Sequence, residues 1–251
     1  MSLNKAKGNM YPWLDYTWNP IRGECPHQCV YCYMRGRWGG PLRIDEKALN
    51  ANLGSGRTIF VGSSTDMWAD KVPDSWIQAV LRHCREYPGN TYLFQTKNPR
   101  RFNSRTLLFP PDTILGTTIE TNRSEYAHSH APDPLFRMSA MLRAAELWSF
   151  PRMVSIEPIL DFDVDVMLDW MRAIMPRFVS IGADSKRHHL REPSRDKLRA
   201  LVNALSTFTE VRIKSNLTRL CEKGGYHERT RAEDEGTTMH LDRGLHRLQV
   251  D

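Results

Sequence analysis

The sequence contains no run of about 18 apolar residues, the length that a membrane-spanning helix needs, and its start lacks the apolar stretch of a secretory signal. Its five cysteines, three of them close together, do not suit the disulfide framework of a short secreted protein. Internal repeats and low-complexity linkers are also missing. We therefore expect a cytoplasmic protein that is not bound to a membrane, and 251 residues suffice for one large α/β domain.

The excess of basic over acidic residues is moderate. The chain has 35 Lys+Arg against 29 Asp+Glu, a formal net charge of +6. Residues 222–251 hold five basic and seven acidic side chains, so residues 1–221 carry the whole excess. This last segment shows little apolar periodicity and begins near a Gly-Gly pair. We expect a domain at 1–221 followed by a polar C-terminal extension at 222–251, and the basic domain is compatible with an anionic partner.

Short apolar runs alternate with helical patterns along the domain, which predicts an α/β fold of βα units. Right-handed crossovers should make the sheet parallel, and six or seven units can curl into a partial, TIM-like (β/α)6 barrel with an extra C-terminal strand and helix. The site is then expected at the carboxyl ends of the strands. Strands are expected at 16–21, 57–62, 91–96, 113–120, 152–158, 178–183 and 210–215, and helices near 41–51, 74–86, 134–148, 163–174 and 194–207.

Three cysteines, Cys25, Cys29 and Cys32, lie together directly after the first expected strand. Three thiolates can hold a [4Fe–4S] cluster and leave one iron free to chelate another molecule. The residues alone also allow a zinc ion completed by a distant histidine or by Cys221, or simply three reduced thiols in a loop. His27 is not expected to be the fourth ligand. The other two cysteines cannot supply a second four-cysteine cluster, so we expect one cluster.

The segment CPHQCVYC, residues 25–32, resembles the radical SAM superfamily motif C-x3-C-x-aromatic-C. In that superfamily the motif follows the first strand of a partial (β/α)6 barrel. The resemblance implies that Cys25, Cys29 and Cys32 bind one [4Fe–4S] cluster and that Tyr31 packs near the adenine of S-adenosylmethionine (SAM). It further implies that an external electron donor reduces the cluster, that SAM is cleaved, and that the resulting 5′-deoxyadenosyl radical abstracts a hydrogen from the substrate.

A longer resemblance covers roughly residues 10–220. The segments DYTWNPIRGECPHQCVYCY, IFVGSSTDMWADKVPDSWI, LFQTKNPRRF, GTTIETN and VSIEPIL are similar to a phage-associated radical SAM family whose members mostly lack an assigned activity. Spore photoproduct lyase, a DNA repair enzyme, is a more distant relative. The resemblance suggests rearrangement (isomerisation) of a modified thymine base in phage DNA, in the bacterial cytoplasm. The alternatives are a radical SAM enzyme acting on a peptide or small metabolite, and a zinc-containing nucleic-acid binder without enzymatic activity.

Polar residues at the ends of the expected strands are candidates for contacts with SAM, which exposes an amino group, a carboxylate, ribose hydroxyls and an adenine edge. The stretch GSSTD stands where the superfamily often has a Gly-Gly-Glu stretch. Any one of these residues could instead cap a helix or belong to a solvated loop, because Ser, Thr and Asp favour such turns. The candidates are Tyr31, Ser63, Ser64, Asp66, Thr118, Glu120, Ser155, Glu157 and Asp184.

Basic residues also follow the expected strands, where they would surround the mouth of the site and suit the phosphates of DNA. A solvated loop explains any one of them alone. Arg35, Arg37 and Trp38 could add a stacking surface. Cys84 is expected in a helix core, whereas Cys221 is a candidate catalytic thiol, with an inert loop thiol as the alternative. The nucleic-acid candidates are Lys97, Arg100, Arg101, Arg123, Lys186, Arg187 and Lys214.

Overall fold

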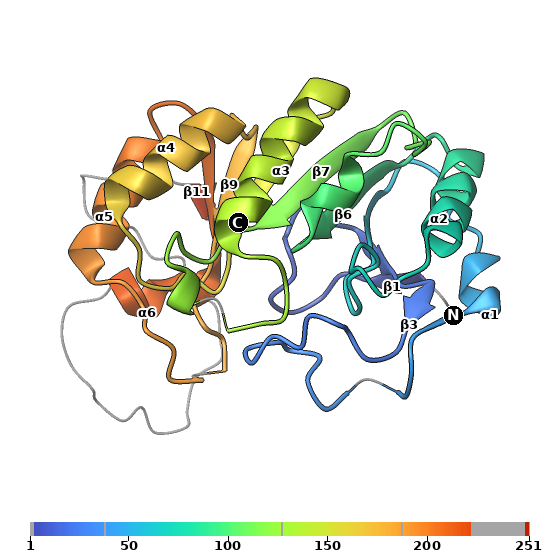
Figure 1. The fold of residues 1–251 in the computed structure, drawn as a ribbon, viewed down its shortest axis with the longest axis horizontal. Coiled ribbons are helices and arrows are strands. Elements are labelled where there is room, and N and C mark those ends of the chain that lie inside the picture. The colour runs from blue at the N-terminus through green and yellow to red at the C-terminus, as the bar shows by residue number, and fades with distance from the viewer. Residues whose placement is uncertain (1–2, 38, 127, 187, 222–248, 251) are drawn as a thin grey trace.

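The computed structural model describes residues 3–37, 39–126, 128–186, 188–221 and 249–250. A nine-stranded sheet runs through the molecule in the order β1-β2-β5-β6-β7-β8-β9-β10-β11 (Figure 1). Its strands are β1 (Leu3–Lys5), β2 (Tyr16–Trp18), β5 (Thr58–Val61), β6 (Thr91–Thr96), β7 (Thr113–Thr118), β8 (Arg152–Ile156), β9 (Phe178–Ile181), β10 (Glu210–Ile213) and β11 (Gln249–Val250). From β2 to β11 neighbouring strands pair in parallel, while β1 runs antiparallel to β2. The sheet is open, with β1 and β11 at its two edges.

Helices cover one face of this sheet (Figure 1). Helix α3 begins at Pro134, whose missing N–H suits the first turn, and Asp133 caps it by accepting from the Leu135 backbone N. Ser194 caps α5 in the same way. In the described part of the chain no helix is long and apolar enough to cross a membrane. The helices are α1 (Glu46–Leu49), α2 (Asp74–Glu86), α3 (Pro134–Leu147), α4 (Val164–Ile174), α5 (Arg195–Leu205) and α6 (Thr218–Cys221), with the 3-10 turns η1 (Pro99–Phe102), η2 (Ser124–Tyr126) and η3 (Ser215–Leu217).

The α/β class and the mostly parallel sheet are therefore confirmed, while the curling of the sheet into a partial barrel stays a prediction. The helix expected near 41–51 is wrong in part: Arg43–Ile44 is strand β4, which pairs with β3 (Ile21–Arg22), and helix remains only at 46–49. Strand β1 was not expected. The predicted extension at 222–251 lies outside the described residues except for β11, which extends the sheet beside β10.

Two apolar cores lie on the two faces of the sheet. The larger one joins the strands to the helices and includes Ile77 and Val80 of α2. The smaller one consists of strand residues and the N-terminal segment: Leu93, Met153 and Phe178 pack with Tyr11 and Leu14. Segment 6–14 therefore fills the face that the helices leave uncovered, and this brings the start of the chain to the carboxyl ends of the central strands.

Candidate active site

One large cavity lies at the carboxyl ends of the parallel strands, where the βα topology predicts a site. Its volume is about 710 Å³, within the roughly 300–1,000 Å³ of small-molecule sites. The loop that carries the three cysteines forms one part of the wall. The N-terminal segment and the residues that follow β5, β6, β8, β9 and β10 form the rest.

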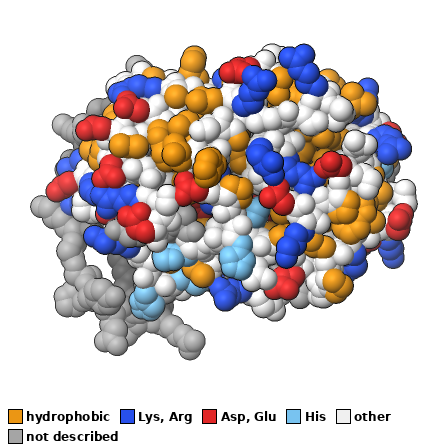
Figure 2. Space-filling view, viewed as in Figure 1, with side chains coloured by type: hydrophobic (Ala, Val, Ile, Leu, Met, Phe, Trp, Pro, Cys, Tyr) orange, Lys and Arg blue, Asp and Glu red, His pale blue; other side chains and the backbone are white. Residues whose placement is uncertain are grey.

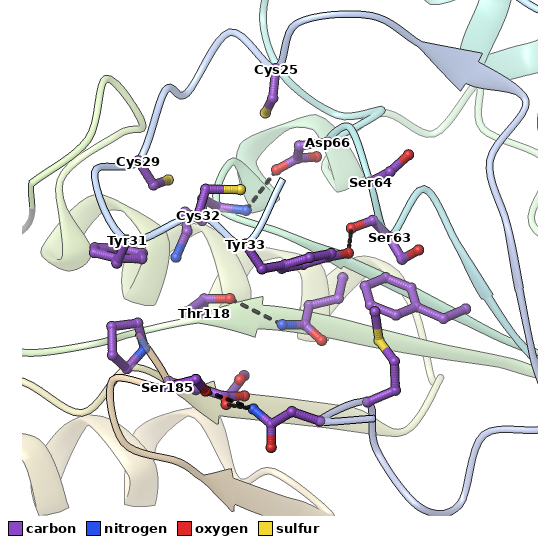
Figure 3. Close-up of a pocket in the computed structure, with 18 of the residues that line it drawn as sticks. Cys25, Cys29, Tyr31, Cys32, Tyr33, Ser63, Ser64, Asp66, Thr118 and Ser185 are labelled. Carbon is purple, nitrogen blue, oxygen red and sulfur yellow. Dashed lines mark hydrogen bonds between the residues drawn. The ribbon is translucent and has the colours of Figure 1, made fainter. Parts of the chain in front are cut away.

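The cysteine loop follows β3 and turns sharply. Cys25, Cys29 and Cys32 all line the cavity, and their sulfur atoms face the space between them (Figure 3). Within the loop the Cys32 backbone N donates to the Cys29 carbonyl at 3.1 Å. At the loop entrance Gly23 has a φ of +104°, and a Cβ there would lie 2.2 Å from the Pro41 carbonyl oxygen. Only glycine fits this position, which sets the direction of the loop.

The three thiols form the donor set that a [4Fe–4S] cluster takes. Among the residues that the structure describes, no three His, Cys, Asp or Glu side chains are grouped so that they could hold one ion. The three sulfur atoms of a cluster site need not converge on one point, because each thiolate binds a different iron. Cys25 and Cys29 are buried, and burial raises the pKa of Cys25 to about 12 and also raises the pKa of Cys29. Binding of iron must therefore displace their protons.

A buried pair fixes the cysteine loop to the segment after β5. His27 Nε2 lies 2.9 Å from Asp66 Oδ2, and the two side chains are only 5% and 11% exposed. The same carboxylate accepts from Thr96 Oγ1 at 2.8 Å and from the Lys97 backbone N at 3.0 Å, and its Oδ1 accepts from a backbone N–H. Burial alone would raise the pKa of Asp66, but His27 and these hydrogen bonds lower it. Asp66, a predicted SAM contact, thus positions the loop between Cys25 and Cys29.

We expect His27→Ala to lower both the stability and the iron content of the protein. The substitution leaves the buried Asp66 carboxylate without its histidine partner, at a cost of about 1–3 kcal/mol, and it frees the loop that carries the thiols. Thermal unfolding by circular dichroism measures the first effect, and iron per folded chain after anaerobic reconstitution measures the second. His27→Gln retains a donor and should recover part of both. A His27→Ala protein with full iron content would show that the pair does not position the loop.

Tyr31 belongs to a second buried network. Its hydroxyl donates to Glu120 Oε1, which also accepts from Lys97 Nζ. Arg137 Nη1 donates to Glu120 Oε2 at 2.6 Å, and both of these side chains are fully buried. Burial would raise the pKa of Glu120, but the charges of Arg137 and Lys97 lower it to about 2. Glu120, another predicted SAM contact, is not among the residues that line the cavity; it holds Tyr31 and Lys97 in the wall.

The other predicted SAM contacts do come together around the cavity. Thr118 Oγ1 accepts from Gln95 Nε2 at 3.0 Å (Figure 3), and the Ser63 hydroxyl lies 3.2 Å from Asn19 Nδ2. The Asp184 carboxylate lies 2.6 Å from His188 Nδ1. Burial raises the pKa of Asp184, but hydrogen bonds from His188 outweigh burial and lower this pKa. Their individual contacts with SAM stay predictions. The residues concerned are Ser63, Ser64, Thr118, Ser155, Glu157 and Asp184.

The N-terminal segment contributes cavity residues that the sequence did not indicate. Tyr11 is buried, and its hydroxyl donates to Gln95 Oε1 at 2.8 Å and lies 2.9 Å from the Ser155 hydroxyl, which can donate to it. Burial raises the pKa of Tyr11 well above its ordinary value. Asn9 Nδ2 donates to Glu157 Oε1 at 2.8 Å. Neither residue belongs to a motif or follows an expected strand, so only their positions in the fold bring them to the site.

Glu157 is held in place from several sides. Lys214 Nζ donates to Glu157 Oε2 at 2.8 Å and also to the carbonyl of Asn9. Asn216 Nδ2 donates to Glu157 Oε1 at 3.2 Å. A Cβ on Gly182 would lie 2.7 Å from Glu157 Cδ, so the glycine provides the space for this carboxylate. Asn216 comes shortly after the end of β10, just as other site residues come after the ends of their strands. This position in the sequence could have predicted Asn216 as a site residue.

The predicted nucleic-acid residues divide into two groups. Lys97, Lys186 and Lys214 line the cavity. On the face shown in Figure 2, basic and acidic side chains are interspersed, so any phosphate-binding surface there is local. Arg187 lies outside the described residues. The remaining three do not line the cavity and form ion pairs with carboxylates: Arg100 with Asp70, Arg101 with Asp74, and Arg123 with Asp161 and Asp163.

The two cysteines outside the loop differ in position. Cys84 is fully buried in the core face of α2, as expected, and burial raises its pKa. Cys221 lies at the end of α6, is partly buried and packs against the larger core. It is not among the residues that line the cavity. A catalytic role for Cys221 stays a prediction.

Residues 9–185 match the family described as "Protein of unknown function (DUF5131)", over more than half of the chain. The chain belongs to this family. The DUF5131 match includes the cysteine loop and the strand ends as far as Ser185, and it stops before β10 and Lys214. No curated protein matches the sequence.

The structure of this DUF5131 chain resembles those of radical SAM enzymes. A spore photoproduct lyase variant is 12% identical, with a TM-score of 0.61 over 81% of this chain and 78% of the lyase. A lyase variant with bound AdoMet and dinucleoside spore photoproduct is 12% identical, with a TM-score of 0.56 over 80% of this chain and 64% of that one. Streptococcus suis SuiB bound to S-adenosylmethionine is 10% identical, with a TM-score of 0.51 over 76% and 48%. The DUF5131 chain thus spans less than two thirds of the latter two, and the likeness concerns the fold.

Proposed function

We propose that this protein is a radical SAM enzyme. The three thiols that line one cavity at the carboxyl ends of a parallel sheet carry this proposal. Cys25, Cys29 and Cys32 would hold one [4Fe–4S] cluster. When bound, the cluster supplies the electron that cleaves SAM into methionine and a 5′-deoxyadenosyl radical, which abstracts a hydrogen from the substrate.

The residues of the chain bind and orient the reactants. Tyr31, fixed by Glu120, presents its ring beside Cys32 for the adenine of SAM. Hydroxyl and carboxylate groups at the strand ends offer partners for the ribose, the amino group and the carboxylate of SAM, among them Ser63, Thr118 and Glu157. A carbon radical needs protection from water, and the cavity wall provides it. The wall also keeps the target carbon close to the adenosyl group.

The proposed substrate is a nucleobase in DNA. Residues 1–221 carry the whole basic excess of the chain, and one structural neighbour, a spore photoproduct lyase, holds a dinucleoside. The finer proposal is rearrangement of a modified thymine in phage DNA. A base inside a duplex would have to leave its stack to reach the cavity, at a cost of a few kcal/mol.

Anaerobic reconstitution with iron and sulfide tests the proposal. We expect a brown protein with about four irons per chain that forms 5′-deoxyadenosine from SAM in the presence of a strong reductant. A colourless protein with one zinc ion would overturn the enzyme assignment. Mass spectrometry of nucleosides from phage DNA, made in hosts with and without the gene, tests the substrate. If the nucleosides are the same in both and only a peptide or metabolite consumes the radical, the nucleobase assignment is wrong.

A further inference from the structure

An exposed aromatic ring lies in the cavity beside the cysteines. Tyr33 follows Cys32 directly, lines the cavity and is 40% exposed. Its hydroxyl donates to the Ser63 carbonyl oxygen, so the ring extends from the cysteine loop toward the segment after β5 (Figure 3). No ring contact of Tyr33 occurs among the described residues, so a planar ligand could stack on it.

Three exposed cations line the same cavity as this ring. Lys7 of the N-terminal segment, Arg37 of the cysteine loop and Lys186 after β9 line the same cavity, and all three are exposed. Lys186 Nζ donates to the Tyr33 backbone carbonyl oxygen at 3.2 Å, which ties this cation to the residue that carries the ring. Within the described part of the chain, Lys7 and Arg37 form no ion pair.

Each carboxylate that lines the cavity is bound by another residue of the chain. Asp66 pairs with His27 and Asp184 with His188. The third carboxylate, Glu157, binds Lys214, and the remaining lining cation, Lys97, is bound by the buried Glu120. Five cations, Lys7, Arg37, Lys97, Lys186 and Lys214, line the cavity against these three carboxylates, so the lining carries net positive charge and includes an exposed aromatic residue. An aromatic platform surrounded by cations is the combination that binds single-stranded nucleic acid.

We propose that Tyr33, Lys7, Arg37 and Lys186 form the entrance at which the protein takes up a nucleotide lying outside a base-paired stack. The base stacks on Tyr33 and the flanking phosphates meet the three cations. This inference rests on the proposed function, since a base on Tyr33 shares the cavity with the three thiols. It assigns phosphate binding to two residues, Lys7 and Arg37, that are not in the group predicted from strand ends.

Fluorescence anisotropy with a labelled single-stranded DNA of about 12 nucleotides tests the entrance, using the reconstituted protein with SAM at about 50–200 mM salt. Removing two phosphate contacts in the double variant Lys7→Gln, Arg37→Gln should reduce the slope of log affinity against log salt by about 1.4. Tyr33→Leu should weaken binding about 10-fold with the slope unchanged. Arg143→Gln, which removes an exposed cation of α3 outside the cavity, should change neither quantity.

Two duplexes of the same sequence, one perfectly paired and one with a central mismatch, form the second arm. The mismatched duplex should bind more tightly, and only its binding should depend on Tyr33. Wild-type affinity and slope in the double variant would overturn the entrance, as would binding of the perfect duplex with the same dependence on Tyr33. If the wild-type protein cleaves SAM but binds no DNA, the entrance and the nucleobase assignment both fail, while the radical SAM assignment stands. Iron content and thermal unfolding check that each variant is folded.

Discussion

Cys29→Ala is expected to abolish the iron–sulfur cluster and, with it, reductive cleavage of SAM. The proposed site has three thiolates, so the loss of one leaves an iron without its protein ligand. Cys29 is buried in the middle of the loop, and its carbonyl accepts from the Cys32 backbone N. Iron per chain after reconstitution should fall toward zero, and 5′-deoxyadenosine should fall to background. Both are measured on the same anaerobic sample.

Two further cysteine variants serve as controls. Cys84→Ala also removes a thiol, but from the core face of α2, and should keep about four irons per chain despite some loss of stability. Cys221→Ala should keep the irons too, because Cys221 does not line the cavity. Loss of metal in Cys221→Ala would favour a zinc site with Cys221 as the fourth ligand. Retention of SAM cleavage in Cys29→Ala would show that the ligand assignment is wrong.

Glu120→Gln is expected to have the largest effect on stability. Glu120 and Arg137 are fully buried, and Lys97 donates to the same carboxylate. The amide of glutamine leaves the charge of Arg137 without a counter-ion, and breaking a buried pair in this way costs about 3–5 kcal/mol. The melting temperature should fall on the order of 10 °C for a domain of this size.

The exposed pair between Glu146 and Arg143 provides the matched control. Both side chains are 61% exposed and lie three residues apart on α3, so Glu146→Gln should change the free energy of unfolding by less than about 1 kcal/mol. Equal melting temperatures for Glu120→Gln and Glu146→Gln would contradict the structural role of the buried network.

The same carboxylate gives a dependence on pH with a defined sign. The pKa of Glu120 is about 2 in the folded protein against an ordinary value of 4.5, because Arg137 and Lys97 outweigh the effect of burial. A lowered pKa contributes stability that is present above the unfolded value and is lost as the pH falls through the folded value. Unfolding free energies measured between pH 5 and about 2 should therefore fall less steeply in Glu120→Gln than in the wild type.

Periodicity and spacing were enough to predict the parts of the fold that depend on local sequence. The strand at 91–96 and the helix at 74–86 have the expected bounds, because apolar alternation and helical spacing act over a few residues. Since the carboxyl ends of parallel strands share one edge, Ser63, Thr118 and Glu157 could be expected at one cavity before the structure was known.

The roles of individual residues depend on partners that the sequence does not reveal. Contacts of Asp66 and Glu120 with SAM stay predictions, but the sequence did not reveal that Asp66 binds a histidine 39 residues away and Glu120 an arginine 17 residues away. Tyr11 reaches the site through Ser155, which is 144 residues along the chain. A polar residue at a strand end is equally able to bind a ligand or to fix a neighbouring loop, and only the tertiary contacts decide between the two.

The hydrogen bonds of Asn9 also constrain the order of events during synthesis. Asn9 is joined to Glu157 and, through its carbonyl, to Lys214, which is 205 residues further along. A ribosome adds roughly 5–20 residues each second, so the start of the chain waits many seconds for these partners to emerge. The three thiols, at residues 25–32, are made before most of the cavity wall, which comes from residues 60–214. They can meet cellular iron carriers, and also oxidants, before the wall that later surrounds them exists.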